Sequence, residues 1–225
     1  MKVMVAAGSR SGSEFLLRLL DAFSPAGIGP LAKVHSARQS QGDFNPSYRE
    51  FREKHDIAGF VRHHNVATLK IEDAGLDDDC DLLFEAFDDA IVLASYRPVE
   101  KVVNSHANIR PWGMSPEKVV GSWIKSLDFF QKAAMAGRMM LVPLNDRSRF
   151  DENAFARLLG QPVSDKATHF LANWPRVNDL RHQKAVSGDK SEIDTHITRA
   201  QLLQEFPEIE AAEKRYSELI DQCNA

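Results

Sequence analysis

Short apolar runs alternate with segments of helical periodicity along the first 160 residues, and this alternation constrains the fold more than any other feature. Apolar runs bounded by turn residues are typical of buried strands. Four such runs occupy Val3–Ala7, Val66–Ile71, Ile91–Ser95 and Met139–Leu144, and a short further strand is expected just before His35. Because strands that alternate with helices favour parallel pairing, we expect an α/β fold with helices flanking a parallel sheet.

Helices are expected between and after these strands. They are predicted to run from Phe15 towards Pro25, after Pro46, over Leu82–Phe87, from Pro98 to about Ser105, over 115–136, and around Phe155–Leu159. From about residue 161 the sequence is more polar and loop-rich, and it closes with an amphipathic helix over roughly 199–222. A chain of 225 residues fits a single domain, with a core over 1–160 and a loop-rich, helical C-terminal part over 161–225.

Charge and cysteine content narrow the function classes. Lysine and arginine number 28 against 32 acidic residues, so the net charge of −4 gives no general reason to expect nucleic-acid binding. Cys80 and Cys223 lack metal or redox spacing and suit a reducing compartment. The N-terminal apolar run Val3–Ala7 is shorter than the roughly 7–15 residues of a signal peptide, and nothing approaches a membrane span. We therefore expect a cytoplasmic protein, without a membrane partner, that works as a monomer or a homodimer.

The segment between the first strand and the first helix reads Gly8-Ser-Arg-Ser-Gly-Ser-Glu14. Free backbone N–H groups and the dipole at the start of a helix favour a phosphate group. Arg10 adds a full positive charge, and Gly12 lets an oxyanion approach the backbone closely. We therefore predict a nucleotide-phosphate site at Ser9–Glu14, with hydroxyl donors from Ser11 and Ser13.

Two features limit this prediction. Only three residues separate Gly8 from Gly12 and no lysine follows, so this is not a Walker A loop, and an ordinary ATPase or GTPase is disfavoured. Ser11 and Glu14 also have the spacing of a capping box, which needs no ligand. The negative charge of Glu14 partly opposes an anion.

A second candidate anchor follows the strand at Ile91–Ser95. Arg97 lies at the start of the next helix, and Ser105 follows eight positions later, about two helical turns along the same face. Because ligands of open parallel sheets bind at the carboxyl ends of the strands, both anchors are expected at one edge of the sheet.

The order of these two motifs resembles the two signature motifs of the sulfotransferases that use 3′-phosphoadenosine-5′-phosphosulfate (PAPS). In that family the first loop holds the 5′-phosphosulfate, with its basic residue on the bridging oxygen, and the Arg and Ser of the second motif hold the 3′-phosphate. The resemblance implies a P-loop NTPase-like architecture, PAPS as donor, 3′,5′-ADP as product and no metal. These roles would fall first to Arg10, Ser11, Gly12 and Ser13, and then to Arg97 and Ser105.

The resemblance covers about residues 1–160, and its layout is nearest to the bacterial carbohydrate sulfotransferases of the trehalose-sulfating type. It implies transfer of a sulfuryl group to a hydroxyl of a carbohydrate or other small acceptor. Supporting features are Leu69-Lys70-Ile71 at the end of a strand, Pro111-Trp112 after the second motif, and the helix that carries Trp123 and Phe130.

The chain also departs from the family pattern. Glu14 stands where the family often has threonine, and Ala32 stands near the position of a glutamate in the trehalose-type enzymes. The stretch from Lys184 to Lys190 is loosely similar to the late basic loop that closes over the nucleotide in cytosolic members.

The general base that would take the acceptor's proton has three candidates. Glu72 comes just after the second long strand, His35 follows the short strand, and His106 neighbours Ser105. Each can equally be a solvated surface group, so the alternatives stay open. A protein of the same fold that binds a ligand or partner without catalysis is the second hypothesis, and an atypical P-loop kinase is a third.

Overall fold

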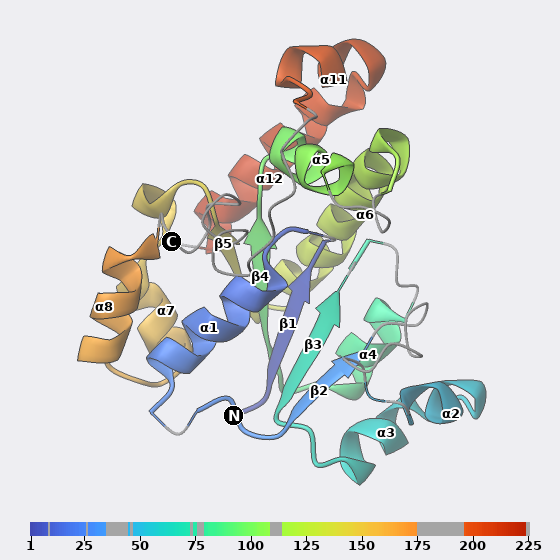
Figure 1. Ribbon diagram of the computed structural model, residues 1–225. Coiled ribbons are helices and arrows are strands. Elements are labelled where there is room, and N and C mark those ends of the chain that lie inside the picture. The colour runs from blue at the N-terminus through green and yellow to red at the C-terminus, as the bar shows by residue number, and fades with distance from the viewer. Residues whose placement is uncertain are drawn as a thin grey trace.

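The computed structural model describes residues 1–8, 10–25, 27–34, 45, 47–72, 74–75, 79–108, 114–174 and 196–223. Five strands form one sheet, in the order β2-β3-β1-β4-β5, and every neighbouring pair is parallel (Figure 1). The strands are β1 (Val3–Ala7), β2 (Leu31–Val34), β3 (Thr68–Glu72), β4 (Ile91–Tyr96) and β5 (Met139–Pro143). The expected α/β fold with a parallel sheet between helices is confirmed.

The helices are α1 (Ser13–Phe23), α2 (Tyr48–Glu53), α3 (Ile57–His63), α4 (Cys80–Ala86), α5 (Val99–Ala107), α6 (Pro116–Met135), α7 (Glu152–Leu158), α8 (Asp165–Ala172), α11 (Arg199–Glu205) and α12 (Glu208–Cys223), with a 3-10 turn at Arg147–Arg149. Helices α1, α7 and α8 cover one face of the sheet, and α4, α5, α6 and α12 cover the other (Figure 1). The protein thus has three layers, with the sheet in the middle.

Side chains of the central strand alternate between the two layers of core. Met4 and Ala6 pack on the face of α5 and α6, whereas Val3, Val5 and Ala7 pack on the face of α1. This alternation follows from the two-residue period of a strand. It explains why β1 is a continuous apolar run, since a strand covered on both faces has no polar side to show.

The carboxyl ends of β1, β3 and β4 meet at one edge of the sheet. Ala7 at the end of β1 is in register with Glu72 of β3, and Ala6 is in register with Ala94 of β4. The loop after β1 therefore lies between the segments that follow β3 and β4. This register places both predicted anchors at the same edge.

The C-terminal segment differs from its prediction in two places. The single helix expected over 199–222 is wrong, because α11 ends and α12 begins around Phe206-Pro207. The residue before a proline is biased away from helical geometry, and Phe206 has a ψ of 75°. Helix α12 then packs on α6, where the buried Tyr216 hydroxyl donates to the Trp123 carbonyl at 2.8 Å.

The region just after residue 161 also contains a helix that the sequence analysis did not predict. Helix α8 begins after Ser164, whose hydroxyl accepts a hydrogen bond from the Ala167 amide at 3.2 Å. Its Phe170 ring packs on Phe15 of α1, and the buried Trp174 indole donates to the Leu144 carbonyl at 2.9 Å. This part of the chain therefore completes the core over α1.

Among the described residues, no helix combines the length and the apolar character needed to cross a bilayer.

Candidate functional site

The loop between β1 and α1 has an unusual backbone. The Ser11 amide donates to the Gly8 carbonyl at 3.0 Å, which closes a tight turn. Arg10 has a φ of 56° and Gly12 a φ of 97°, both in the left-handed region. That region is uncommon for a residue with a side chain, and such residues gather at ligand sites, so the strained Arg10 marks the loop as a candidate site.

Gly12 is the N-cap of α1 and has no side chain with which to cap it. The alternative interpretation of Ser11 and Glu14 as a capping box is therefore wrong, and the Glu14 carboxylate contacts Lys70 instead. The first N–H groups of a helix have no carbonyl of that helix to bind. With the helix dipole, they give the start of α1 a partial positive charge that suits an oxyanion.

The segment after β4 supports the loop from its other side. The buried Ser95 hydroxyl donates to the Ser11 carbonyl at 2.6 Å, and an Nη of Arg97 donates to the Arg10 carbonyl at 2.8 Å. Because these bonds engage the loop's carbonyl oxygens, they fix its backbone against β4. Trp123 of α6 in turn donates to the Arg97 carbonyl at 3.0 Å and holds that residue in place.

The two predicted anchors meet at Arg10. Its Nε donates to the Ser105 hydroxyl at 3.2 Å, although the two residues are 95 positions apart. The structure therefore brings Arg10, Arg97 and Ser105 together at the end of β1 and β4. One detail of the prediction is wrong: Arg97 does not begin the helix, because Pro98 is the N-cap and α5 starts at Val99.

The two arginines make the site electropositive. Burial, and then the like charge of Arg10, lowers the pKa of Arg97 to about 10, so that Arg97 stays protonated at neutral pH. Within the described ranges the Arg97 guanidinium forms no ion pair. Two neighbouring cations, one of them half-buried, repel each other, and a bound anion would stabilise both. Arginine also binds phosphate and sulfate oxygens with paired hydrogen bonds.

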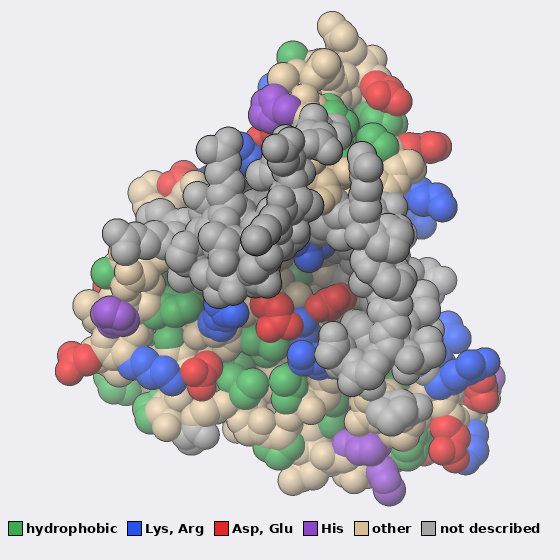
Figure 2. All heavy atoms as spheres, viewed as in Figure 1, with side chains coloured by type: hydrophobic (Ala, Val, Ile, Leu, Met, Phe, Trp, Pro, Cys, Tyr) green, Lys and Arg blue, Asp and Glu red, His purple; other side chains and the backbone are tan. Residues whose placement is uncertain are grey.

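A second set of charges lies on the β3 side of the loop. Lys70 of β3 is 1% exposed, and its Nζ lies 2.6 Å from Glu72 Oε1 and also contacts Glu14 Oε1. The Nζ of Lys33 in β2 lies 3.7 Å from the same Glu14 oxygen. The Ser13 hydroxyl donates a hydrogen bond to Glu72 Oε1 at 3.3 Å. Figure 2 shows acidic and basic side chains gathered in the middle of the face viewed.

Glu14 is held in its ionised form by these lysines. Burial raises its pKa, but the hydrogen bond and charge of Lys70, followed by the charges of Lys33 and Arg18, outweigh that effect and lower the pKa below its ordinary value. Glu14 therefore does not add an uncompensated negative charge to the loop. Lys70 was not predicted as a site residue, and its only sequence signal is a lysine between apolar neighbours in a strand.

The candidate general bases Glu72 and His106 have different surroundings in the structure. Glu72 contacts the loop through Ser13, and its carboxylate is already engaged by Lys70. His106 is 2% exposed and accepts from the Met114 amide at 3.4 Å, so its interpretation as a surface group is wrong. His35 lies outside the described residues.

Other predicted features also lie outside the described residues: Ser9 of the loop, Pro111-Trp112, and the stretch from Lys184 to Lys190. In the part of the chain that is described, no three His, Cys, Asp or Glu side chains are grouped as metal ligands.

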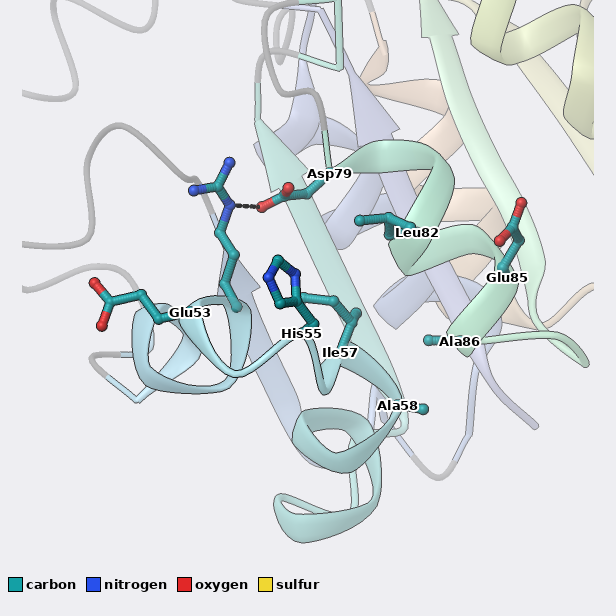
Figure 3. Close-up of a pocket in the computed structure, with 9 residues that line it drawn as sticks. Glu53, His55, Ile57, Ala58, Asp79, Leu82, Glu85 and Ala86 are labelled. Atoms are coloured by element: carbon teal, nitrogen blue, oxygen red, sulfur yellow. Dashed lines mark hydrogen bonds and ion pairs between the residues drawn. The ribbon is translucent and has the colours of Figure 1, made fainter.

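A pocket of about 690 Å³ lies elsewhere, between the α2–α3 segment and α4. In Figure 3 the side chains of His55 and Ile57 lie on one side and Leu82 and Ala86 of α4 on the other. Asp79 at its rim accepts from the Arg52 Nε at 2.5 Å, the dashed contact in the figure. In the described chain, the residues that line this pocket include none from the loop between β1 and α1, so the two sites are separate.

Taken together, the loop, Arg10, Arg97 and Ser105 form a site suited to an oxyanion with more than one negative charge. No family model matches this chain, and no curated protein matches it. Its function is therefore inferred from these residues.

Proposed function

We propose that this chain is a PAPS-dependent sulfotransferase of P-loop NTPase-like architecture, which moves a sulfuryl group from PAPS to a hydroxyl of a carbohydrate or other small acceptor. The observation that carries the proposal is the convergence of Arg10, Arg97 and Ser105 at the glycine loop after β1. The motif order in the sequence and the parallel sheet are consistent with it.

In this proposal the start of α1, with Ser11, Gly12 and Ser13, holds the 5′-phosphosulfate, and Arg97 with Ser105 holds the 3′-phosphate. The acceptor oxygen attacks sulfur, the bond from sulfur to the bridging oxygen breaks, and its electron pair stays on the departing 3′,5′-ADP. Arg10 stabilises that developing charge, which is the main contribution that a protein makes to such an in-line transfer.

The acceptor's proton must leave as the new bond forms. We assign this role to Glu72, because its carboxylate accepts a hydrogen bond from the Ser13 hydroxyl of the loop. His35 remains the alternative base. Neither assignment requires a metal ion.

The proposal is tested by calorimetric titration with 3′,5′-ADP, using Arg10→Ala and Arg97→Ala. Each variant should bind about tenfold to a hundredfold more weakly, because a hydrogen bond to a charged group contributes about 1.5–3 kcal/mol. Arg62→Ala is the matched control, since it removes an exposed arginine of α3. ATP with magnesium serves as the comparison ligand. Unchanged affinity of both site variants for 3′,5′-ADP would contradict the proposal, and magnesium-dependent binding of ATP in its place would favour a kinase.

A protein that binds the nucleotide without catalysis is the alternative. It is favoured by one observation: the Glu72 carboxylate already forms an ion pair with Lys70 and accepts a hydrogen bond from Ser13, which weakens it as a base. Incubation with PAPS and a panel of sugars distinguishes the two. Acceptor-dependent release of 3′,5′-ADP excludes the alternative, whereas tight binding without release with any acceptor supports it.

A further inference from the structure

A buried lysine in the middle of a parallel sheet requires an explanation. Lys70 lies in β3 between β2 and β1, its side chain is 1% exposed, and its neighbours Leu69 and Ile71 are core residues. Burying an ammonium group is costly unless it is paired and hydrogen-bonded. Lys70 meets this requirement with two carboxylates, Glu14 from α1 and Glu72 from the end of its own strand.

These pairs determine the charge balance beside the loop. Glu14 and Glu72 carry two negative charges, and Lys70 and Lys33 carry two positive charges within ion-pair distance of them. The four charges cancel, so Glu14 and Glu72 do not offset the positive charge at the helix start. Without Lys70, a net negative charge would lie at the end of β3 beside the first turn of α1, where it would repel an anion.

The position of the Lys70 ammonium also matters. It contacts Oε1 of both Glu14 and Glu72, and the Ser13 hydroxyl donates a hydrogen bond to the same Glu72 oxygen. Carboxylate and hydroxyl oxygens are the ligands that magnesium prefers. The ammonium group therefore lies between two carboxylates whose charge a divalent cation would also neutralise.

We propose that Lys70 is the built-in cation of the phosphate loop: a positioning residue that neutralises Glu14 and Glu72 and thereby makes nucleotide binding independent of divalent metal. The proposal rests on the proposed function, because it names how that same site is charged. Lys70 acts through the two carboxylates, since its buried Nζ is already engaged by both.

The test is titration of 3′,5′-ADP into wild-type protein and Lys70→Met, each with EDTA and with magnesium. Wild-type affinity should be the same in both buffers. Lys70→Met should bind about tenfold more weakly in EDTA, as expected for one unit charge lost close to a phosphate. Magnesium should restore part of that loss only in the variant.

Two further variants separate charge from packing. Lys70→Met combined with Glu14→Gln removes one charge of each sign, so it should regain most of the wild-type affinity in EDTA. Glu14→Gln alone keeps the buried lysine and should bind 3′,5′-ADP severalfold more tightly than wild type. This variant still tests the proposal if Lys70→Met does not fold. Circular dichroism and thermal unfolding establish which variants are folded.

The outcomes are distinct. Unchanged binding by folded Lys70→Met, failure of Glu14→Gln to tighten binding, or a magnesium requirement in the wild type would each overturn the role of Lys70 while leaving the proposed function intact. Absence of 3′,5′-ADP binding by the wild type in either buffer would overturn the proposed function and this inference with it.

Discussion

Replacement of Gly12 by alanine tests the geometry of the loop most directly. Gly12 has a φ of 97°, a left-handed conformation that disfavours any residue with a Cβ. A Cβ built at this position would overlap Cδ1 of Leu144 and lie 3.5 Å from its Cγ. Leu144 is itself buried, so its side chain has little room to move away.

The expected cost has two parts. The left-handed backbone costs about 1–2 kcal/mol for a residue with a side chain. The overlap with Leu144 adds about 1–3 kcal/mol, as is usual for overpacking a core. The free energy of unfolding should therefore fall by about 2–5 kcal/mol, which corresponds to a drop in Tm of about 4–20 °C for a domain of this size.

The assay is urea or thermal unfolding followed by circular dichroism, with Gly137→Ala as the matched control. Gly137 has a φ of 66° and open space around its Cβ position, so its variant carries the backbone strain without the overlap. Gly12→Ala should lose at least about 1 kcal/mol more than the control and should also weaken 3′,5′-ADP binding. Equal losses in the two variants would refute the close approach of Leu144 to the loop.

Three other perturbations follow from the same contacts. Gly75→Ala should destabilise the fold by about 1–3 kcal/mol, because its Cβ would lie closer than 3.0 Å to backbone atoms of α6; Gly121→Ala, with nothing within 4 Å, should be neutral or slightly stabilising in the same unfolding assay. Trp123→Phe should cost about 1–3 kcal/mol by leaving the Arg97 carbonyl without its donor, and should weaken 3′,5′-ADP binding, whereas wild-type affinity and stability would show that this hydrogen bond is dispensable. Because the pKa of Glu14 is lowered on folding, its ion pair contributes stability above about pH 4.5 that is lost as the pH falls through the lower folded pKa. Glu14→Gln should therefore show a shallower loss of stability as the pH falls below about 4.5, and parallel curves for variant and wild type would contradict the pairing.

Much of the fold follows from local patterns in the sequence. A strand covered on both faces is mostly apolar, so the runs Val3–Ala7 and Met139–Leu144 could be predicted as strands from their own residues alone. The glycine loop could also be predicted from local sequence, since glycine is favoured where the backbone is left-handed, as at Gly12. Boundaries shifted by one or two residues, because hydrogen bonding rather than composition ends an element.

Other elements were misjudged for physical reasons. Helix α8 is amphipathic but short. It is stabilised by packing on α1, a contact that no local sequence pattern indicates. Pro207 in the sequence indicates that the last helix is divided there. The apolar periodicity on both sides of Pro207 nevertheless suggests one continuous helix.

The site itself depends on tertiary structure. Arg10, Arg97 and Ser105 were each candidates from the sequence, but only the placement of β4 beside β1 brings them into contact. The pairing of Lys70 with Glu14 depends in the same way on β3 lying on the other side of β1. Local sequence determines which segments become strands, because this depends on the apolar pattern of residues adjacent in the sequence. The order of the strands depends on how all the layers pack together, and that order decides which charges meet.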